Sequence, residues 1–124
     1  MSHRILIVED QEDNRAILRD LLSANGYDFT EATDGAAAVE AAELTRPDLI
    51  LMDIQLPVMD GYEATRRIKT NPALKAIPVI AVTSYALSGE EGKAAAAGCD
   101  GYVAKPFSPR MLLVKIREYL PSGG

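Results

Sequence analysis

Cysteine and histidine are nearly absent from this sequence, which contains one of each. A single cysteine, Cys99, excludes an intrachain disulfide and a metal cluster built on cysteines, so it is interpreted as a buried or half-buried structural thiol. The single histidine, His3, precedes the first strand-like run and is expected on the surface. The chain therefore offers no plausible set of zinc ligands.

Long hydrophobic runs and an excess of basic residues are also missing. The strongly apolar run at residues 49–52 is far shorter than the roughly 20 residues that span a bilayer. Met1 to Arg4 leads directly into a strand-like run, without a signal-peptide pattern. We therefore expect a cytoplasmic protein with no membrane contact. The 13 basic and 18 acidic residues give a formal charge of -5, which disfavours direct nucleic-acid binding.

Short apolar runs recur along the chain, a pattern typical of strands buried on both faces of a parallel sheet. They span residues 5–8, 49–52, 79–82 and 102–104. Residues 27–32 form a weaker and more polar run, which is expected at an edge of the sheet. The sequence therefore predicts five strands.

Helical patterns separate these runs. A first helix is expected to end near Asn25, with an apolar stripe formed by Ile17, Leu18, Leu21 and Leu22. Asp34 opens an alanine-rich helix that runs to about Thr45, while Asp60 and Ser88 each stand three residues before a glutamate, as in a capping box. The last helix is expected to begin at Ser108, before Pro109, and to bury Leu112, Leu113, Ile116 and Leu120.

Strands that alternate with helices through short loops predict parallel crossover connections. The expected fold is therefore α/β, a three-layer sandwich with helices on both faces of a five-stranded parallel sheet. A length of 124 residues fits one domain over residues 1–124.

Polar residues stand at the ends of the apolar runs, where ligands bind in open parallel sheets. Glu9 and Asp10 follow residues 5–8, and Asp53 follows residues 49–52. Thr83 and Lys105 follow the last two runs. We expect all five side chains to meet at one edge of the sheet, which requires the first and third strands to be neighbours.

Three carboxylates held together repel one another, by about 1–4 kcal/mol per pair at about 4 Å, so the cluster favours a bound cation. A few oxygen ligands that are open to water suit Mg²⁺ better than Ca²⁺. An aspartate beside Mg²⁺ can attack a phosphoryl group, and the Lys105 ammonium can neutralise the transferring oxygens. The Thr83 hydroxyl can bond the new phosphate. These residues predict a phosphoryl-accepting site on Asp53.

This set resembles the signature of response-regulator receiver domains, formed here by Glu9, Asp10, Asp53, Thr83, Lys105 and Pro106. The resemblance covers essentially the whole chain and implies a flavodoxin-like sheet with strand order 2-1-3-4-5. Residues 49–57 and 60–61 most resemble single-domain regulators and the receivers of hybrid kinases. The resemblance makes Asp53 the phosphoacceptor. It makes Glu9 and Asp10 metal-binding acids that hold Mg²⁺ with Asp53 and the backbone carbonyl of Gln55.

Further roles follow from the same resemblance. Thr83 and Lys105 would contact the phosphate, and Tyr102 would turn inward when Thr83 moves. The Lys105-Pro106 peptide bond would be cis. A tyrosine on a strand is also commonly a half-buried packing residue with a solvated hydroxyl, and this simpler reading of Tyr102 stays open.

The expected function is a single-domain response regulator that signals by phosphorylation-dependent protein binding. A histidine kinase or a histidine phosphotransfer protein would donate the phosphoryl group, because His3 is the only histidine. The downstream partner would bind the face formed by the helix after Ser88, the strand at residues 102–104 and the helix after Ser108. No output domain is expected after Leu120. The chain is not expected to be an enzyme, beyond assisting its own phosphorylation and dephosphorylation.

Other functions remain open at this point. A relay intermediate that passes phosphate between two histidine proteins, or the receiver part of a hybrid kinase, would carry the same residues. An aspartyl phosphatase is disfavoured because Gln55 stands where a second acid would protonate the leaving group. A scaffold that is never phosphorylated is disfavoured because every residue that the chemistry needs is present.

Overall fold

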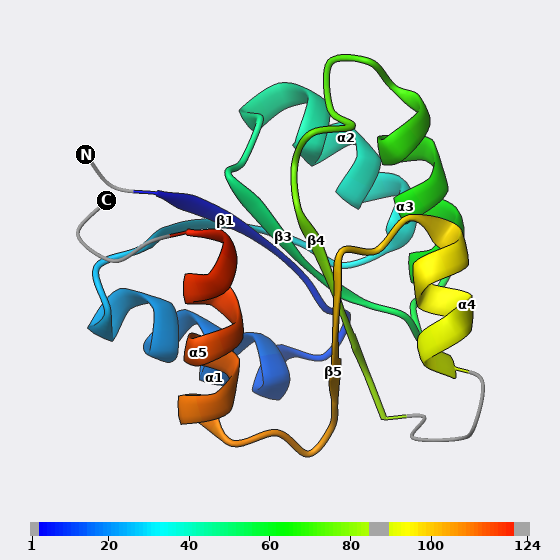
Figure 1. Ribbon diagram of the computed structural model, residues 1–124. Helices are drawn as coiled ribbons and strands as arrows, with labels where there is room; N and C mark the ends of the chain where they lie inside the picture. Colours follow the sequence, from blue (N-terminus) through cyan, green and yellow to red (C-terminus); the bar gives the residue numbers. More distant parts are fainter. Residues whose placement is uncertain (1–2, 85–89, 121–124) are drawn as a thin grey trace.

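The computed structural model describes residues 3–84 and 90–120, in which strands and helices alternate (Figure 1). The strands are β1 (Arg4–Val8), β2 (Asp28–Ala32), β3 (Leu49–Asp53), β4 (Val79–Thr83) and β5 (Gly101–Ala104). The helices are α1 (Glu12–Ala24), α2 (Gly35–Thr45), α3 (Gly61–Thr70), α4 (Glu90–Ala97) and α5 (Pro109–Tyr119). The predicted α/β fold is confirmed.

The strands form one parallel sheet in the order β2-β1-β3-β4-β5, which confirms the order implied by the resemblance. Leu6 of β1 lies opposite Thr30 of β2 on one side and Ile50 of β3 on the other. The polar strand β2 lies at an edge, as expected, and every residue of β3 and β4 is buried. The carboxyl ends of β1, β3 and β4 are therefore adjacent.

Helices cover both faces of the sheet, so the predicted three-layer sandwich is confirmed (Figure 1). Ile5 and Ile7 of β1 point toward α1 and α5, where the core consists mainly of large branched side chains. Leu6 and Val8 point to the opposite face, toward α2, α3 and α4. The helices on that face contribute many alanines to the core. Successive residues of a strand point to opposite faces, so a continuous apolar run supplies both cores.

Helix starts follow the predicted capping residues. The side chains of Asp34, Asp60 and Ser108 each accept a hydrogen bond from the backbone amide three residues later, at 2.8–3.0 Å. Each cap satisfies an amide that has no partner within the helix, which typically stabilises a helix by about 1 kcal/mol. Ser88, the predicted cap of the fourth helix, lies outside the described residues.

Two residues of the predicted helical stripes are less buried than the pattern indicates. Ile17 is 52% exposed, because α1 packs on the sheet through Leu18 and Leu22 and leaves Ile17 beside a surface cavity. Leu113 is only half-buried, since Leu112 and Ile116 form the buried stripe of α5. Within the described residues, no helix is both long and apolar enough to cross a membrane.

Candidate functional site

The carboxyl edge of the sheet collects the predicted acidic residues. Glu9 and Asp10 directly follow β1, and Asp53 is the last residue of β3. One carboxylate oxygen from each of these residues lies within 4.8 Å of the others. The pairing of β1 with β3 produces this cluster, because Val8 lies opposite Met52 and both chains leave the sheet at the same level.

Lys105 directly follows β5, the edge strand opposite β2, and its side chain reaches the cluster. Its Nζ atom lies 2.7 Å from Glu9 Oε1 and 3.5 Å from Asp53 Oδ2. The Lys105 amide donates to the Thr83 carbonyl oxygen at 2.7 Å, which fixes the backbone of the lysine beside the end of β4. The peptide bond between Lys105 and Pro106 is cis.

Gly61 brings the start of α3 against the site. A Cβ atom at this position would lie 2.4 Å from the Asp53 carbonyl oxygen, which no side chain can tolerate. The Gly61 amide donates to the Ile54 carbonyl oxygen at 3.0 Å. Glycine is therefore needed where the helix returns this closely to the end of β3.

Burial controls the ionisation of the two inner acids, Glu9 and Asp53, which are 2% and 4% exposed. Burial and the neighbouring Glu9 charge raise the pKa of Asp53 to about 7, although Lys105 and the Gln55 amide oppose the rise. Burial also acts to raise the pKa of Glu9. However, hydrogen bonds from Lys105 and the Gln11 amide hold that pKa below its usual value. The site thus favours the ionised form of Glu9 and the protonated form of Asp53.

The donor atoms fit a small divalent cation. Three carboxylates face one ammonium group, so the cluster carries excess negative charge when all its members are ionised. Asp10 is exposed while Glu9 and Asp53 are buried, which leaves one side of the cluster open to water. Mg²⁺ prefers oxygen ligands and keeps several waters, so this donor set suits it.

Gln55 and Ser84 lie at the rim of the site. The Gln55 amide donates to Asp53 Oδ1 at 3.1 Å, and the Ser84 hydroxyl donates to Oε1 of the Gln55 side chain. This bond connects the loop after β3 with the end of β4. The sequence analysis missed Ser84, although its position directly after Thr83 was an available signal.

Thr83 and Tyr102 lie on adjacent strands. Thr83 is fully buried as the last residue of β4, opposite Ala104 of β5. Tyr102 lies further from the site on β5, opposite Ala81, and its half-buried side chain packs against the core on the α2–α4 face. The structure thus places Thr83 at the carboxyl edge of the sheet, whereas Tyr102 lies two residues before the end of β5.

A cavity of about 330 Å³ opens beside the acidic cluster. Asp53 and Lys105 line its polar end, and its largely apolar wall includes Ile17, Leu18, Val82 and Phe107. Ile17 on α1 is exposed and lines this cavity, so an exposed apolar side chain borders the site. The buried Asp53 carboxylate thus borders a surface cavity on this side.

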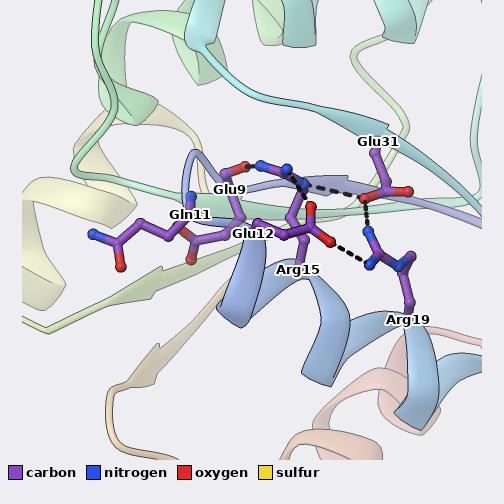
Figure 2. A network of polar contacts seen from close by, with 6 residues as sticks. All are labelled: Glu9, Gln11, Glu12, Arg15, Arg19 and Glu31. Carbon is purple, nitrogen blue, oxygen red and sulfur yellow. Dashed lines mark hydrogen bonds and ion pairs between the residues drawn. The ribbon is translucent and has the colours of Figure 1, made fainter.

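The sequence analysis also did not identify Arg15. Its guanidinium donates through Nη1 to the Glu9 carbonyl oxygen at 2.9 Å, as Figure 2 shows. The position of Arg15, within the first turn and a half of the helix that follows two acids, is the signal that could have identified it.

Known proteins resemble this chain over nearly its whole length. The model of the response regulator receiver domain family matches residues 5–117. Curated relatives include the polar-differentiation response regulator DivK of Brucella anthropi, which is 43% identical over 120 residues. That alignment covers 97% of this chain and 98% of the relative.

Solved structures show the same likeness. One is the receiver domain of a sensor histidine kinase from Pseudomonas aeruginosa, with a magnesium ion coordinated in its active-site cleft. It superposes with a TM-score of 0.90 at 39% identity, over 98% of this chain and 100% of that one. The chemotaxis protein CheY4 of Vibrio cholerae superposes with a TM-score of 0.90 at 28% identity, over 96% of this chain and 99% of that one.

Proposed function

Because the chain belongs to the response regulator receiver domain family, which serves two-component signalling and is not a family of classical enzymes, we propose that Asp53 accepts a phosphoryl group. The observation that supports this best is the placement of a buried Asp53 beside Lys105, Glu9 and Asp10. Phosphorylation would then change which protein the domain binds.

The proposed transfer needs a donor on another molecule. His3 lies before β1 and 3.9 Å from Asp48, at the end of the sheet opposite Asp53. It therefore cannot reach the acceptor. The donor would be a phosphohistidine of a histidine kinase or a histidine phosphotransfer protein. We propose that the transfer takes place in the cytoplasm.

In the transfer, an Oδ atom of Asp53 attacks phosphorus, and the bond between phosphorus and the donor nitrogen breaks. The released imidazole keeps the electron pair, and the product on Asp53 is an acyl phosphate. Lys105 neutralises charge on the transferring oxygens. Mg²⁺, held by Glu9, Asp10, Asp53 and the Gln55 carbonyl, would add positive charge and favour ionised Asp53.

Thr83 and Tyr102 would carry the signal away from the site. A phosphate on Asp53 offers the Thr83 hydroxyl a new acceptor, which would draw the end of β4 toward it. Tyr102 on the adjacent strand would then change its packing against the core. The surface of α4, β5 and α5 would change with it, so phosphorylation would shift a population between two arrangements through differential contacts.

A phosphorelay intermediate is the second candidate. The likeness to the receiver domain of a sensor histidine kinase, at 39% identity, favours it. The acceptor chemistry would be the same, but Asp53 would pass the phosphoryl group to a second histidine protein. Incubating the phosphorylated chain with a histidine phosphotransfer protein, and following the label, separates this candidate from the first.

The acceptor role is tested by incubation with acetyl phosphate, with and without Mg²⁺, followed by intact mass measurement. We expect a gain of one phosphoryl mass that requires Mg²⁺ and disappears in Asp53→Asn. Asp20→Asn, which alters an exposed acid on α1, is the matched control and should be modified like the parent. Modification of Asp53→Asn, or none of the parent with Mg²⁺ and rapid sampling, would contradict the proposal.

A further inference from the structure

Arg15 connects α1 to the backbone of the acidic loop. Its Nη1 atom lies 2.9 Å from the Glu9 carbonyl oxygen, so the guanidinium binds the peptide group that joins Glu9 to Asp10 (Figure 2). The side chain is only 14% exposed. A hydrogen bond from a charged donor in such a place is stronger than one between neutral groups.

Acidic neighbours hold the guanidinium in this orientation. Arg15 Nη2 lies 2.5 Å from Glu12 Oε2, and Arg15 Nε lies 3.2 Å from Glu31 Oε1. Arg19 bonds the same two acids, at 2.6 and 2.7 Å, and closes a ring that joins α1 to β2 (Figure 2). Guanidinium is planar and presents donors in fixed directions, so partners on several sides leave it little freedom.

The Glu9-Asp10 peptide needs this bond to be fixed. The Glu9 amide is held by the Ala32 carbonyl oxygen at 3.0 Å, and the Glu9 side chain by Lys105. The Arg15 bond fixes the carbonyl, so the plane of the next peptide is determined. Within residues 3–84 and 90–120, no hydrogen bond holds the exposed carboxylate of Asp10. The backbone of Asp10 therefore sets where its Cβ atom lies, and with it the positions that its carboxylate can reach.

We propose that Arg15 is a positioning residue for cation binding. It holds the Glu9-Asp10 peptide so that both carboxylates face the cation before the cation arrives. This inference rests on the proposed function, since it takes Mg²⁺ as the cation of this site. Partners behind metal ligands commonly set metal affinity in this way.

Electrostatics alone predicts the opposite effect. Arg15 carries a positive charge near a cation site, so its removal would strengthen Mg²⁺ binding if charge were all that mattered. Loss of a positioning bond would weaken binding instead. The sign of the change in affinity thus separates the two accounts.

Arg19 provides the matched control. It shares Glu12 and Glu31 with Arg15, but only Arg15 contacts the Glu9 carbonyl oxygen. Mg²⁺ titrations of the parent, Arg15→Met and Arg19→Met, followed through backbone amide shifts in NMR spectra, give the three affinities. We expect Arg15→Met to bind Mg²⁺ about tenfold more weakly, as typical for a lost outer partner. Arg19→Met should stay within about twofold, because Arg19 lies one turn further along α1 and the effect of its charge on the site is screened by salt.

A second readout uses acetyl phosphate. Arg15→Met should need about ten times more Mg²⁺ for its half-maximal phosphorylation rate and should recover the parent rate at saturating Mg²⁺. Spectra recorded in EDTA test whether each variant is folded. Should Arg15→Met fail to fold, Arg15→Lys keeps the charge without the planar fork and should still bind Mg²⁺ more weakly.

Two results would overturn the inference: an affinity of the Arg15 variant equal to or tighter than that of the parent, or equal losses in the Arg15 and Arg19 variants. Absence of Mg²⁺ binding by the parent would instead contradict the metal site of the proposed function. The two failures are therefore distinguishable.

Discussion

Each end of the sheet carries a lysine beside an aspartate, but the two pairs differ in how fully they are satisfied. At the amino end, Lys69 Nζ lies 2.8 Å from Asp100 Oδ2, which also accepts the Val79 amide at 2.9 Å. Lys69 donates further to the Ile77 carbonyl oxygen at 2.7 Å. These bonds tie α3, β4 and the start of β5 together, and both charges of the Lys69–Asp100 pair have close partners.

The carboxyl end is less complete. Lys105 lies nearest to Glu9, at 2.7 Å, and is 3.5 Å from Asp53, so one ammonium group serves two buried acids. The outcome is a pKa of about 7 for Asp53, raised by burial and by Glu9. A Lys–Asp pair therefore stabilises a fold when further donors complete it. Where one lysine serves two acids, as Lys105 does, the pair leaves an acid that can bind a further cation.

The largest expected effect on stability comes from Asp53→Asn, which removes a buried carboxylate that burial and Glu9 disfavour in its charged form. In EDTA, the stability associated with the raised Asp53 pKa is complete below about pH 4 and is lost as the pH rises through about 7, because the unfolded chain ionises first. Asn cannot ionise. The variant should therefore be more stable than the parent at about pH 8, by about 2–4 kcal/mol, with a smaller difference at about pH 5.

Urea unfolding followed by far-ultraviolet circular dichroism measures this difference, since the chain has no tryptophan. Adding Mg²⁺ should reduce the advantage of the variant at the higher pH by stabilising the parent. Equal stability of parent and variant at both pH values would show that Asp53 is not held in an unfavourable charged state.

Breaking the satisfied pair should have an effect of opposite sign. Asp100→Ala removes the acceptor of Lys69 and of the Val79 amide, so we expect a loss of about 2 kcal/mol in the free energy of unfolding. Phosphorylation of the folded variant should persist, because this pair lies at the far end of the sheet. Asp20→Ala is the control on an exposed acid and should change stability by less than about 0.5 kcal/mol. A similar loss in both variants would contradict the proposed importance of the Asp100 contacts.

The smallest expected effect concerns backbone strain beside the site. Val58, in the loop between β3 and α3, has φ of 68° and is 86% exposed. At the amino end, Gly26, Gly98 and Arg46 also adopt positive φ, but none of them is β-branched. In this region the Cβ atom approaches the following carbonyl oxygen, and β-branching adds to the cost, so Val58→Gly should stabilise the protein by about 0.5–1 kcal/mol. Thermal unfolding of Val58→Gly and Val58→Ala checks this. Ala keeps a Cβ atom, so an equal gain in both variants would argue against strain as the cause.

Local signals predicted most of the fold. The apolar runs located every strand to within one residue at each end, because strands buried on both faces need continuous apolar sequence. The capping residues Asp34, Asp60 and Ser108 located three helix starts. Ile17 was misplaced because helical spacing alone does not show how wide a stripe the sheet covers.

The candidate site was predictable only in part. Its central residues stand at strand ends, so the parallel sheet brings them together whatever the surrounding detail. Arg15 was missed although it lies in the first turns of the helix after the two acids, because position alone does not show which group its guanidinium contacts. Its bond to the Glu9 carbonyl oxygen requires the folded loop, and its contact with Glu31 depends on the pairing of β1 with β2. These contacts follow from the tertiary structure and not from a residue pattern.

The contact between Lys105 and Glu9 joins residues 96 positions apart. During synthesis on the ribosome, Glu9, Asp10 and Asp53 all emerge long before the lysine that compensates them. Until then, bringing the three acids together is unfavourable, because no counter-charge offsets their repulsion. Docking of the last strand supplies that charge, so the sheet and the charge-compensated acidic edge are completed in the same step.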